Sequence, residues 1–427
     1  MPSPVTPPRG MRDILPADKA RREALLARIR DTYRRHGFDE IETPVMEDSS
    51  RLHAGLGGDN EKLAFAVLKR GLTSDDLRSA DSPLDLADLG LRFDLTVPLA
   101  RFYASNRAEL PNVFRAIQIA PVWRAERPQK GRYRQFVQCD IDIIGEPGVI
   151  AEIELISATV DALTALGVPG CTIRINDRRL LMSMLDALGF PAEQADAVLI
   201  TLDKLDKIGV DGVLAELRER GMPEAAVAAL AEVPALRAAA AGDSATAAVS
   251  DAAIRASLPA GVDEQAIADL AAIAAAVGEA VPLAFDPFLV RGMGYYTGPI
   301  FEVAHPELGY SLGGGGRYDG MIGRFAGTDI AACGFSLGFE RLVDLVVGDA
   351  DSRSGSALVV DKDAAAADII TLKRMLVASG ERVRVVTRTK NMRALLEQLE
   401  RDGYARFASV RAGDAELAAL QWRALGE

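Results

Sequence analysis

The chain has 427 residues, and 49 lysines and arginines against 61 aspartates and glutamates give it a formal net charge of −12. That length predicts two to four domains, because one hydrophobic core rarely serves so long a chain. The acidic total argues against a protein that coats a nucleic acid with its whole surface, so such a partner would need a local basic patch.

The cysteines, histidines and apolar residues exclude further classes. Three cysteines and three histidines show no HExxH or CxxC spacing, which predicts that there is no zinc site and favours a reducing compartment. The proline-rich start has no apolar segment typical of an export signal, and no apolar run of about 18 residues occurs elsewhere. We therefore expect a soluble, cytoplasmic protein with no membrane partner.

The first hundred residues predict a helix followed by strands. Residues 17–35 carry apolar side chains at helical spacing, and Gly37 stands where a helix-ending glycine belongs. Residues 40–48 read as a strand that Pro44 interrupts, which favours a sheet edge or an interface. Residues 91–96 are expected to form a strand that leads directly into a helix.

Residues 114–145 predict a β-hairpin with an unusual distribution of charge. The segment from Arg115 to Arg134 holds six lysines or arginines and a single acid, which in so acidic a chain indicates an anionic ligand such as a phosphate. Along the return arm, side chains alternate between an apolar face and a polar face, the latter with Phe136, Gln138, Asp140 and Asp142. A solvated antiparallel strand would show the same alternation and is the alternative.

The amino-acid composition changes in the middle of the chain. Residues 178–281 are rich in alanine and lose their strand signals, which predicts a helical insertion into a core formed by residues 1–177 and 282–347. Within that core, the four glycines at 313–316 would let the backbone approach a ligand closely, or would simply form a bend.

The end of the chain predicts a separate small domain. Residues 348–356 are typical of a linker, and residues 357–427 alternate strands and helices as in an α/β domain with a mostly parallel sheet. From Asp351 onward there are 13 lysines or arginines against 11 acids, so this part is more basic than the rest. That difference is consistent with a role that faces RNA.

Several segments together resemble the histidyl-tRNA synthetases, a family of class II aminoacyl-tRNA synthetases. VWRAERPQKGRYRQFVQCDIDIIG (122–145) resembles class II motif 2, LVRGMGYYTGPIFE (289–302) the histidine-specific motif, and GFSLGFERL (334–342) motif 3. The segments PPRGMRDILP and LRFDLTVPLAR are also typical of this family. The resemblance implies an α+β fold: an antiparallel six-stranded sheet flanked by helices, a helical insertion and a C-terminal anticodon-binding α/β domain. It also implies a homodimer, with the strand that contains Pro44 near the subunit interface.

The reaction that this resemblance implies joins two anions. Histidine and ATP, accompanied by Mg²⁺, would form histidyl-adenylate and pyrophosphate, and histidine would then pass to the 3′ end of tRNA(His). Because a carboxylate attacks an α-phosphate, the site must neutralise negative charge. The family assigns Arg124 to the α-phosphate and the histidine carboxylate, with Arg124 expected in mid-strand on the polar face. Arg291 would stand where other class II enzymes place a metal ion, and Arg341 would hold the phosphates near their γ end.

The resemblance assigns the remaining site residues to three ligands. Histidine would be bound at its α-amino group by Asp94, Thr96 and Gln138, and at its side chain by Asp142, Tyr295 and Tyr296. ATP would be bound by Glu126 at the adenine amino group, by Arg132, and by Phe136, which would stack on the base. The acceptor end of the tRNA would meet Arg127 and Lys130 at the hairpin tip, whereas Asp140 is left as a structural residue.

The chain departs from the family pattern in its specific motif and at its end. Gly294 stands where the family often has an acid, and the C-terminal domain is short. One alternative is a non-charging paralogue that regulates ATP phosphoribosyltransferase in histidine biosynthesis, in which the ATP arginines are eroded. Another is a tRNA-independent ligase that passes activated histidine to a small molecule. Retention of Arg124, Arg291 and Arg341 together with a C-terminal domain favours the synthetase.

Overall fold

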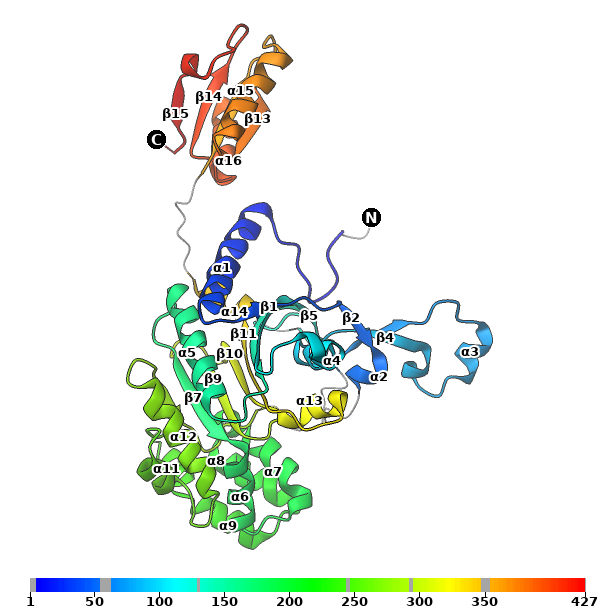
Figure 1. Cartoon of the computed structure of the whole chain (residues 1–427), viewed down its shortest axis with the longest axis vertical. Coiled ribbons are helices and arrows are strands. Elements are labelled where there is room, and N and C mark those ends of the chain that lie inside the picture. Colours follow the sequence, from blue (N-terminus) through cyan, green and yellow to red (C-terminus); the bar gives the residue numbers. More distant parts are fainter. Residues whose placement is uncertain are drawn as a thin grey trace. The chain divides into compact units, whose positions relative to one another are not determined.

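The protein folds into two compact units, which a computed structural model describes over residues 5–53, 63–128, 131–242, 246–291, 295–346 and 354–426. The first unit comprises residues 1–12 and 25–346, and the second comprises residues 13–24 and 347–427 (Figure 1). No helix among the described residues is both long enough and apolar enough to cross a membrane.

An eight-stranded mixed sheet forms the centre of the first unit. Its strands, in spatial order, are β1 (Asp39–Glu40), β5 (Phe114–Trp123), β6 (Gln135–Ile144), β11 (Ala332–Gly338), β10 (Gly313–Arg317), β9 (Pro299–Ala304), β7 (Thr172–Asp177) and β8 (Leu283–Phe285). The six strands from β5 to β7 pair antiparallel, while β1 and β8 add a parallel strand at each edge. The expected six-stranded antiparallel sheet is therefore the middle of a larger one.

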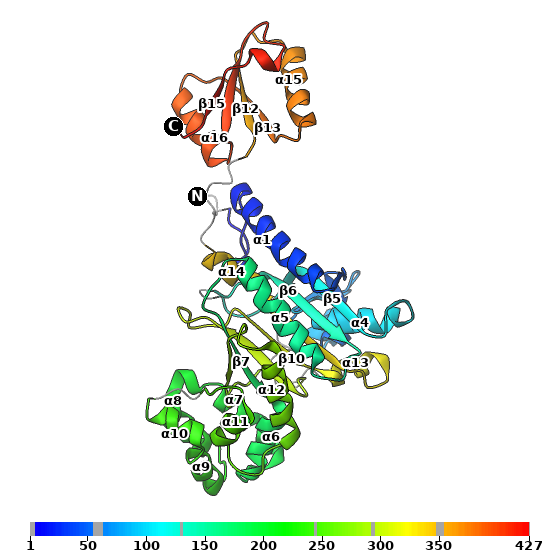
Figure 2. The ribbon, with the colours of Figure 1, turned by 60° about the vertical axis from the view of Figure 1, so that its left-hand side comes forward.

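One face of this sheet is covered by helices and is dry. The alternate residues Cys139, Ile141 and Ile143 of β6 pack in one core with the second half of α1 (Pro16–Arg35) and with α5 (Ile150–Ala165) (Figure 2). Helix α5 buries residues 151, 155, 158 and 162, a spacing that keeps them on one side of a 3.6-residue helix. Each large apolar side chain buried here contributes roughly 1.5–3 kcal/mol.

The predicted hairpin is confirmed, and its polar arm is not solvated. β5 and β6 pair in a register that sets Val122 opposite Phe136 and Gln118 opposite Asp140. Asp140 and Asp142 are each only 4% exposed. The alternative of a solvated strand is therefore wrong, because the polar face of β6 is buried as well as the apolar one.

Two expectations about strands near the start of the chain are wrong. Residues 40–48 do not form one strand, since β1 ends before Pro44 and β2 (Met46–Asp48) belongs to a different, three-stranded sheet, although both are edge strands as Pro44 predicted. The expected strand 91–96 is absent because β4 (Ala87–Leu91) ends at its first residue. Arg92 instead buries its guanidinium against the backbone oxygens of Thr43 and Pro121.

The three-stranded sheet carries a projecting arm and leads into a second core. Its order is β2-β4-β3, and α3 lies at the far end of the arm (Figure 1). The elements here are α2 (Ser49–Leu52), β3 (Phe65–Leu68), α3 (Ser74–Ser79), the 3-10 helices Pro83–Leu86 and Arg107–Glu109, and α4 (Thr96–Asn106). Helix α4 packs with α13 (Asp319–Ala326) in this second core, and α14 (Phe339–Leu345) follows β11.

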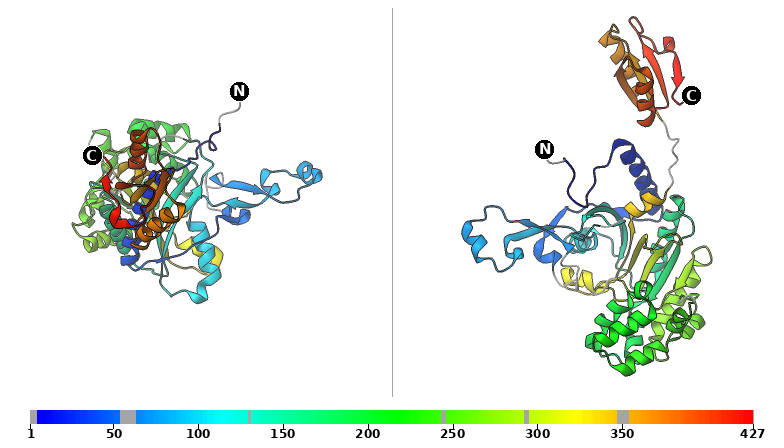
Figure 3. Two further views of the ribbon diagram at one scale, coloured as in Figure 1. Left: turned by 90° about the horizontal axis from the view of Figure 1, so that it is seen from above. Right: turned by 180° about the vertical axis from the view of Figure 1, so that it is seen from behind.

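The helical stretch lies between β7 and β8 and gathers into one group beside the sheet (Figure 3). Its helices are α6 (Arg178–Ala187), α7 (Ala195–Leu202), α8 (Leu205–Glu219), α9 (Glu224–Ala231), α10 (Pro234–Ala240), α11 (Asp251–Ser257) and α12 (Glu264–Val277), with a 3-10 turn at Ala192–Gln194. Their buried side chains join the same core as the sheet, and the stretch belongs to the first compact unit. The limits of a separate insertion domain stay a prediction.

The C-terminal part of the second unit is a four-stranded sheet with a helix on each face. Its order is β13 (Val383–Thr387), β12 (Ser356–Val360), β14 (Arg406–Val410) and β15 (Trp422–Ala424), and only β15 runs antiparallel. Along β12, Leu358 and Val360 face the core of α15 (Ala366–Ala378), while Ala357 and Val359 face that of α16 (Met392–Arg401). The predicted small α/β fold with a mostly parallel sheet is confirmed.

Candidate active site

The polar face of the main sheet presents two rows of residues across adjacent strands. One row runs Asp142, Gly334, Gly316 and Ile300, and the next runs Asp140, Ser336, Gly314 and Glu302. Residues paired directly across antiparallel strands share a face. The polar side chains of β6, β11 and β9 therefore surround a floor of glycines.

The glycine run is a buried strand, so the expectation of a simple bend is wrong. A Cβ at Gly314 would lie 2.5 Å from Cζ of Arg291, and one at Gly316 would lie 3.1 Å from Cδ1 of Tyr296. A Cβ at Gly334 on the neighbouring strand would lie 1.9 Å from Oδ1 of Asp142. The missing side chains thus make room for predicted site residues.

Three carboxylates lie close together on this face, of which Asp140 and Asp142 are buried and Asp94 is half-buried. The Tyr318 hydroxyl donates to Asp142 Oδ1 at 2.6 Å, and burial raises the pKa of Asp142 to about 7, with the charge of Asp94 adding to the rise. Burial, together with the charge of Asp142, raises the pKa of Asp140 well above its usual range. Burial also raises the pKa of Asp94, which accepts from the backbone N–H of Val97 at 3.2 Å. Such a group favours a cationic ligand.

Amide and hydroxyl groups lie beside the same carboxylates. Gln138 donates to Ser336 Oγ at 2.8 Å and to Asp140 at 3.3 Å, and its own Oε1 is buried without a partner among the described residues. Thr96 begins α4, directly beyond Asp94. The Tyr295 and Tyr296 hydroxyls lie 3.3 Å apart, and burial raises the pKa of both.

Three arginines lie within electrostatic reach of a fourth, Arg341. Burial lowers the pKa of the Arg341 guanidinium, and the neighbouring charges of Arg132, Arg291 and Arg124 lower it further. Bringing cations together costs free energy that an anionic ligand would recover. The four come from the hairpin, from the segment after β8 and from α14, so the fold itself assembles them.

Each arginine is held by a neighbour. Arg291 pairs with Glu302, and Arg341 donates to the backbone oxygen of Ser311, with its Cζ 5.2 Å from the Tyr310 ring centroid. Arg132 lies 3.6 Å from Glu126. The guanidinium of Arg341 therefore has uncharged partners, whereas Arg291 and Arg132 each lie against a carboxylate.

Arg124 is not in mid-strand, because β5 ends at Trp123. Its backbone N–H donates to the oxygen of Arg134 at 2.9 Å and extends the hairpin ladder by one residue, while Nε donates to the oxygen of Phe93 at 3.0 Å. Its Cζ lies 5.0 Å from the ring centroid of Phe136, which is half-buried on the polar face. The hairpin therefore brings these two predicted ATP residues together.

The comparisons with known proteins agree with this geometry. The model of the histidyl-tRNA synthetase family matches residues 10–342. A histidine–tRNA ligase of Leifsonia xyli subsp. xyli is 58% identical over 434 residues, and the alignment covers 100% of both chains. The chain belongs to the histidyl-tRNA synthetase family. A probable histidine–tRNA ligase of Tropheryma whipplei (strain Twist) is 44% identical over 409 residues, which cover 94% of this chain and 95% of that protein.

Solved structures confirm the predicted α+β fold. Histidyl-tRNA synthetase from Nostoc sp. PCC 7120 has a TM-score of 0.73 at 23% identity and covers 99% of this chain and 95% of that one. An ATP phosphoribosyltransferase regulatory subunit/histidyl-tRNA synthetase from Bacillus halodurans C has a TM-score of 0.74 at 22% identity, over 96% and 99% of the two chains. At such identities the likeness concerns the fold alone.

In this member of the histidyl-tRNA synthetase family, the N-terminal segment clamps the motif 2 hairpin. The backbone N–H of Arg134 donates to the oxygen of Gly10 at 2.8 Å. Arg12 donates to the Tyr133 hydroxyl at 3.0 Å and to Glu340 at 2.6 Å, and its Cζ lies 3.7 Å from the Tyr133 ring centroid. One arginine thus links the N-terminal segment, motif 2 and the helix of motif 3.

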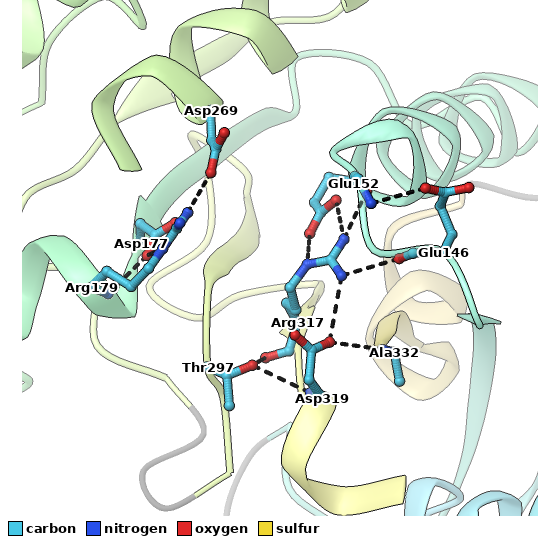
Figure 4. A network of polar contacts seen from close by, with 10 residues as sticks. Glu146, Glu152, Asp177, Arg179, Asp269, Thr297, Arg317, Asp319 and Ala332 are labelled. Atoms are coloured by element: carbon cyan, nitrogen blue, oxygen red, sulfur yellow. Dashed lines mark hydrogen bonds and ion pairs between the residues drawn. The ribbon is translucent and has the colours of Figure 1, made fainter. Parts of the chain in front are cut away.

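A buried ion-pair network supports the strand end that presents Tyr318 (Figure 4). Arg317 donates to Glu152 at 2.7 Å, and both side chains are buried. Asp319 accepts from the backbone N–H of Ala332 at 2.8 Å. A polar cavity of about 300 Å³ borders this network and Arg179, and it is lined by different residues from those predicted for the site.

Several residues at the site were missed from the sequence. Tyr318, Tyr310, Ser336 and Glu302 all touch predicted site residues. Period-two alternation along the quoted motifs would have placed Ser336 and Glu302 on the site face, whereas nothing local marks Tyr318. Arg127 is exposed on the hairpin loop. Lys130 and Gly294 lie outside the described residues.

Proposed function

We propose that this chain activates histidine with ATP to histidyl-adenylate, releasing pyrophosphate, and transfers histidine to the 3′ end of tRNA(His). The predicted enzyme, a histidine–tRNA ligase, is confirmed by full-length identity of 58% to a protein of that name, and nothing in the comparisons favours the regulatory paralogue. The observation that carries the mechanism is the group of four arginines, three of which act on Arg341, near two buried carboxylates and the half-buried Asp94.

The arginines would neutralise the reacting anions. An oxygen of the histidine carboxylate attacks the α-phosphorus, negative charge gathers on the phosphoryl oxygens, and pyrophosphate leaves with the electron pair of the broken bond. Arg124 and Arg291 would stabilise the carboxylate and the α-phosphoryl group, and Arg341 the phosphates near the γ end. Mg²⁺ would accompany ATP through phosphate oxygens and water. Among the described residues no cluster of acids, cysteines and histidines forms a metal site of its own.

The carboxylates would select histidine by charge and hydrogen bonding. Asp94, Thr96 and Gln138 would hold the α-amino group, where a carboxylate offsets the ammonium. Asp142 would accept a hydrogen from the imidazole, and the Tyr318 hydroxyl bond supports this by fixing the orientation of the carboxylate. The hydroxyls of Tyr295 and Tyr296 would complete the pocket.

The hairpin would bind the nucleotide and the tRNA. Phe136 would stack on adenine, Glu126 would accept from its amino group, and Arg132 would reach the phosphates. The contact of Phe136 with Arg124 and the pairing of Arg132 with Glu126 support this assignment. Arg127 and Lys130 would contact the acceptor end of the tRNA.

The remaining features of the proposal concern the whole protein. We place the catalytic core in residues 1–177 and 282–347, the insertion in 178–281, the linker in 348–356 and the anticodon-binding-like domain in 357–427. The enzyme would act as a homodimer in the cytoplasm, with histidine, ATP and tRNA(His) as its partners.

A charging assay with purified tRNA and each of the twenty amino acids tests the proposal. Histidine alone should be attached, and histidine alone should support exchange of pyrophosphate into ATP. A protein that exchanges pyrophosphate but never charges tRNA would be the tRNA-independent ligase. One that binds histidine and does neither would be the regulatory paralogue.

A further inference from the structure

Glu302 is an anion in the middle of a site that must bind anions. It lies on β9 in the row that the polar face of the sheet presents, directly across from Gly314. Its carboxylate pairs with Arg291 and lies 3.5 Å from Arg174. A negative charge here opposes the binding of ATP, so its presence requires a specific reason.

That reason lies in the backbone that carries Arg291. Residues 286–291 follow β8 and form neither helix nor strand, so no ladder orients the Arg291 side chain. Its guanidinium lies over Gly314, in space that a Cβ would fill at 2.5 Å. Glycine provides the room, and Glu302 is the carboxylate that forms an ion pair with this guanidinium.

The ion pairs and the backbone form a closed ring. Glu302 pairs with Arg174 of β7, and Arg174 pairs with Asp286, which is 2% exposed. Asp286 begins the segment whose last residue is Arg291, and it also accepts from the backbone N–H of Phe288 at 3.0 Å. The chain of charges from Asp286 through Arg174 to Glu302 therefore ties both ends of this segment to the sheet.

We propose that Glu302 is a positioning residue, which holds the Arg291 guanidinium over Gly314 at the point where charge develops during adenylate formation. This inference rests on the proposed function. Misplacement of a reacting group by about 1 Å can cost about 100-fold in rate, so an ion pair of modest stability can matter greatly to catalysis. The alternative is a pair that only adds stability, which for partly exposed groups amounts to about 0–1 kcal/mol.

Chemical rescue distinguishes positioning from stability. Arg291→Ala should lose about 10²–10³ in histidine-dependent pyrophosphate exchange, as expected for a group that stabilises transition-state charge. Guanidinium ion at a low, non-denaturing concentration should then bind against Glu302 over Gly314 and restore part of the activity. In Arg291→Ala/Glu302→Gln the same guanidinium should restore nothing, because its counter-charge is gone.

Two single variants complete the experiment. Glu302→Gln should lower kcat by about 10- to 100-fold, with KM for ATP within about threefold and an unchanged melting temperature. Gly314→Ala should act likewise, because its Cβ would displace the flexible end of Arg291 rather than the backbone. It serves equally well where Glu302→Gln fails to fold. Glu307→Gln, at an exposed turn of the same chain, is the matched control and should retain parental kcat.

The outcomes separate this inference from the proposed function. Rescue that is equal with and without Glu302, or a Glu302→Gln variant with parental kcat and only a lower melting temperature, overturns the positioning role alone. Full activity in Arg291→Ala overturns the role of Arg291 and the inference with it. A parent protein without histidine-dependent exchange overturns the proposed function itself.

Discussion

Before histidine binds, the charged form of Asp142 costs free energy because the side chain is buried. Its burial raises the pKa to about 7, so near neutral pH the empty site holds the proton on about half of the molecules. In the unfolded chain the pKa lies near 3.9, and the folded state therefore binds more protons between the two values. The contribution of this group to the free energy of unfolding consequently falls as pH rises from about 4 to 7. We infer that stability is sacrificed for a carboxylate that accepts from histidine.

Asp142→Asn should therefore stabilise the empty protein and abolish its activity. Near pH 8 the melting temperature of the variant should exceed that of the parent, because the amide carries no buried charge. Near pH 5, where Asp142 is protonated, the difference should disappear. Thermal unfolding at the two pH values, together with histidine-dependent exchange, measures both effects. A variant that is less stable than the parent at pH 8 would show that the charge of Asp142 is compensated in the empty site.

At the residue scale, the sequence predicted well which residues of one strand share a face. It predicted poorly which residues of different strands contact each other. Alternation along β6 placed Gln138, Asp140 and Asp142 together on one face, as the structure shows. Tyr318 was missed because its contact with Asp142 depends on which distant strands lie side by side. The order of strands in a sheet is a non-local property, so it cannot be predicted from the alternation of side chains along one strand.

At the scale of elements, the motif 2 hairpin is fixed at its base. Arg134 at the base is held by Gly10 and by the backbone oxygen of Glu126, whereas Arg127 is exposed. The hairpin could be predicted because its alternation and its Pro/Gly tip are local signals. The strand expected at 91–96 was not found, because the buried contacts of Arg92 with distant backbone oxygens outweighed local strand propensity.

Arg127→Gln combined with Lys130→Gln should impair tRNA charging while leaving adenylate formation nearly intact. Each phosphate contact that is lost should reduce the slope of log affinity against log salt by about 0.7–0.9. Charging and pyrophosphate exchange across a salt series provide the measurement, and Arg70→Gln on the projecting arm is a suitable control for loss of exposed charge. Equal losses in both activities would mean that the tip serves ATP rather than tRNA.

At the scale of the whole molecule, the hydrophobic cores divide the chain at different places from those that its amino-acid composition suggests. The alanine-rich helices look like a separate domain in the sequence, yet their Leu and Ile side chains share one core with the main sheet. Among the described residues, by contrast, the two cores of the terminal sheet are built from residues between 357 and 425 alone. Composition could predict both segments, but it could not predict which of them buries its apolar surface against the sheet.

Independent cores make the last domain removable. The more basic charge from Asp351 onward, 13 lysines and arginines against 11 acids, favours RNA as its ligand. We therefore expect a chain that ends at Asp349 to retain histidine-dependent pyrophosphate exchange within about threefold, a change of less than about 1 kcal/mol. Its KM for tRNA should rise by at least about tenfold, which corresponds to about 1.4 kcal/mol of lost binding, and charging should recover in part at high tRNA concentration. Undiminished charging at low tRNA concentration would show that residues 357–427 do not bind tRNA. Loss of exchange together with charging would show that the catalytic unit depends on this domain to fold.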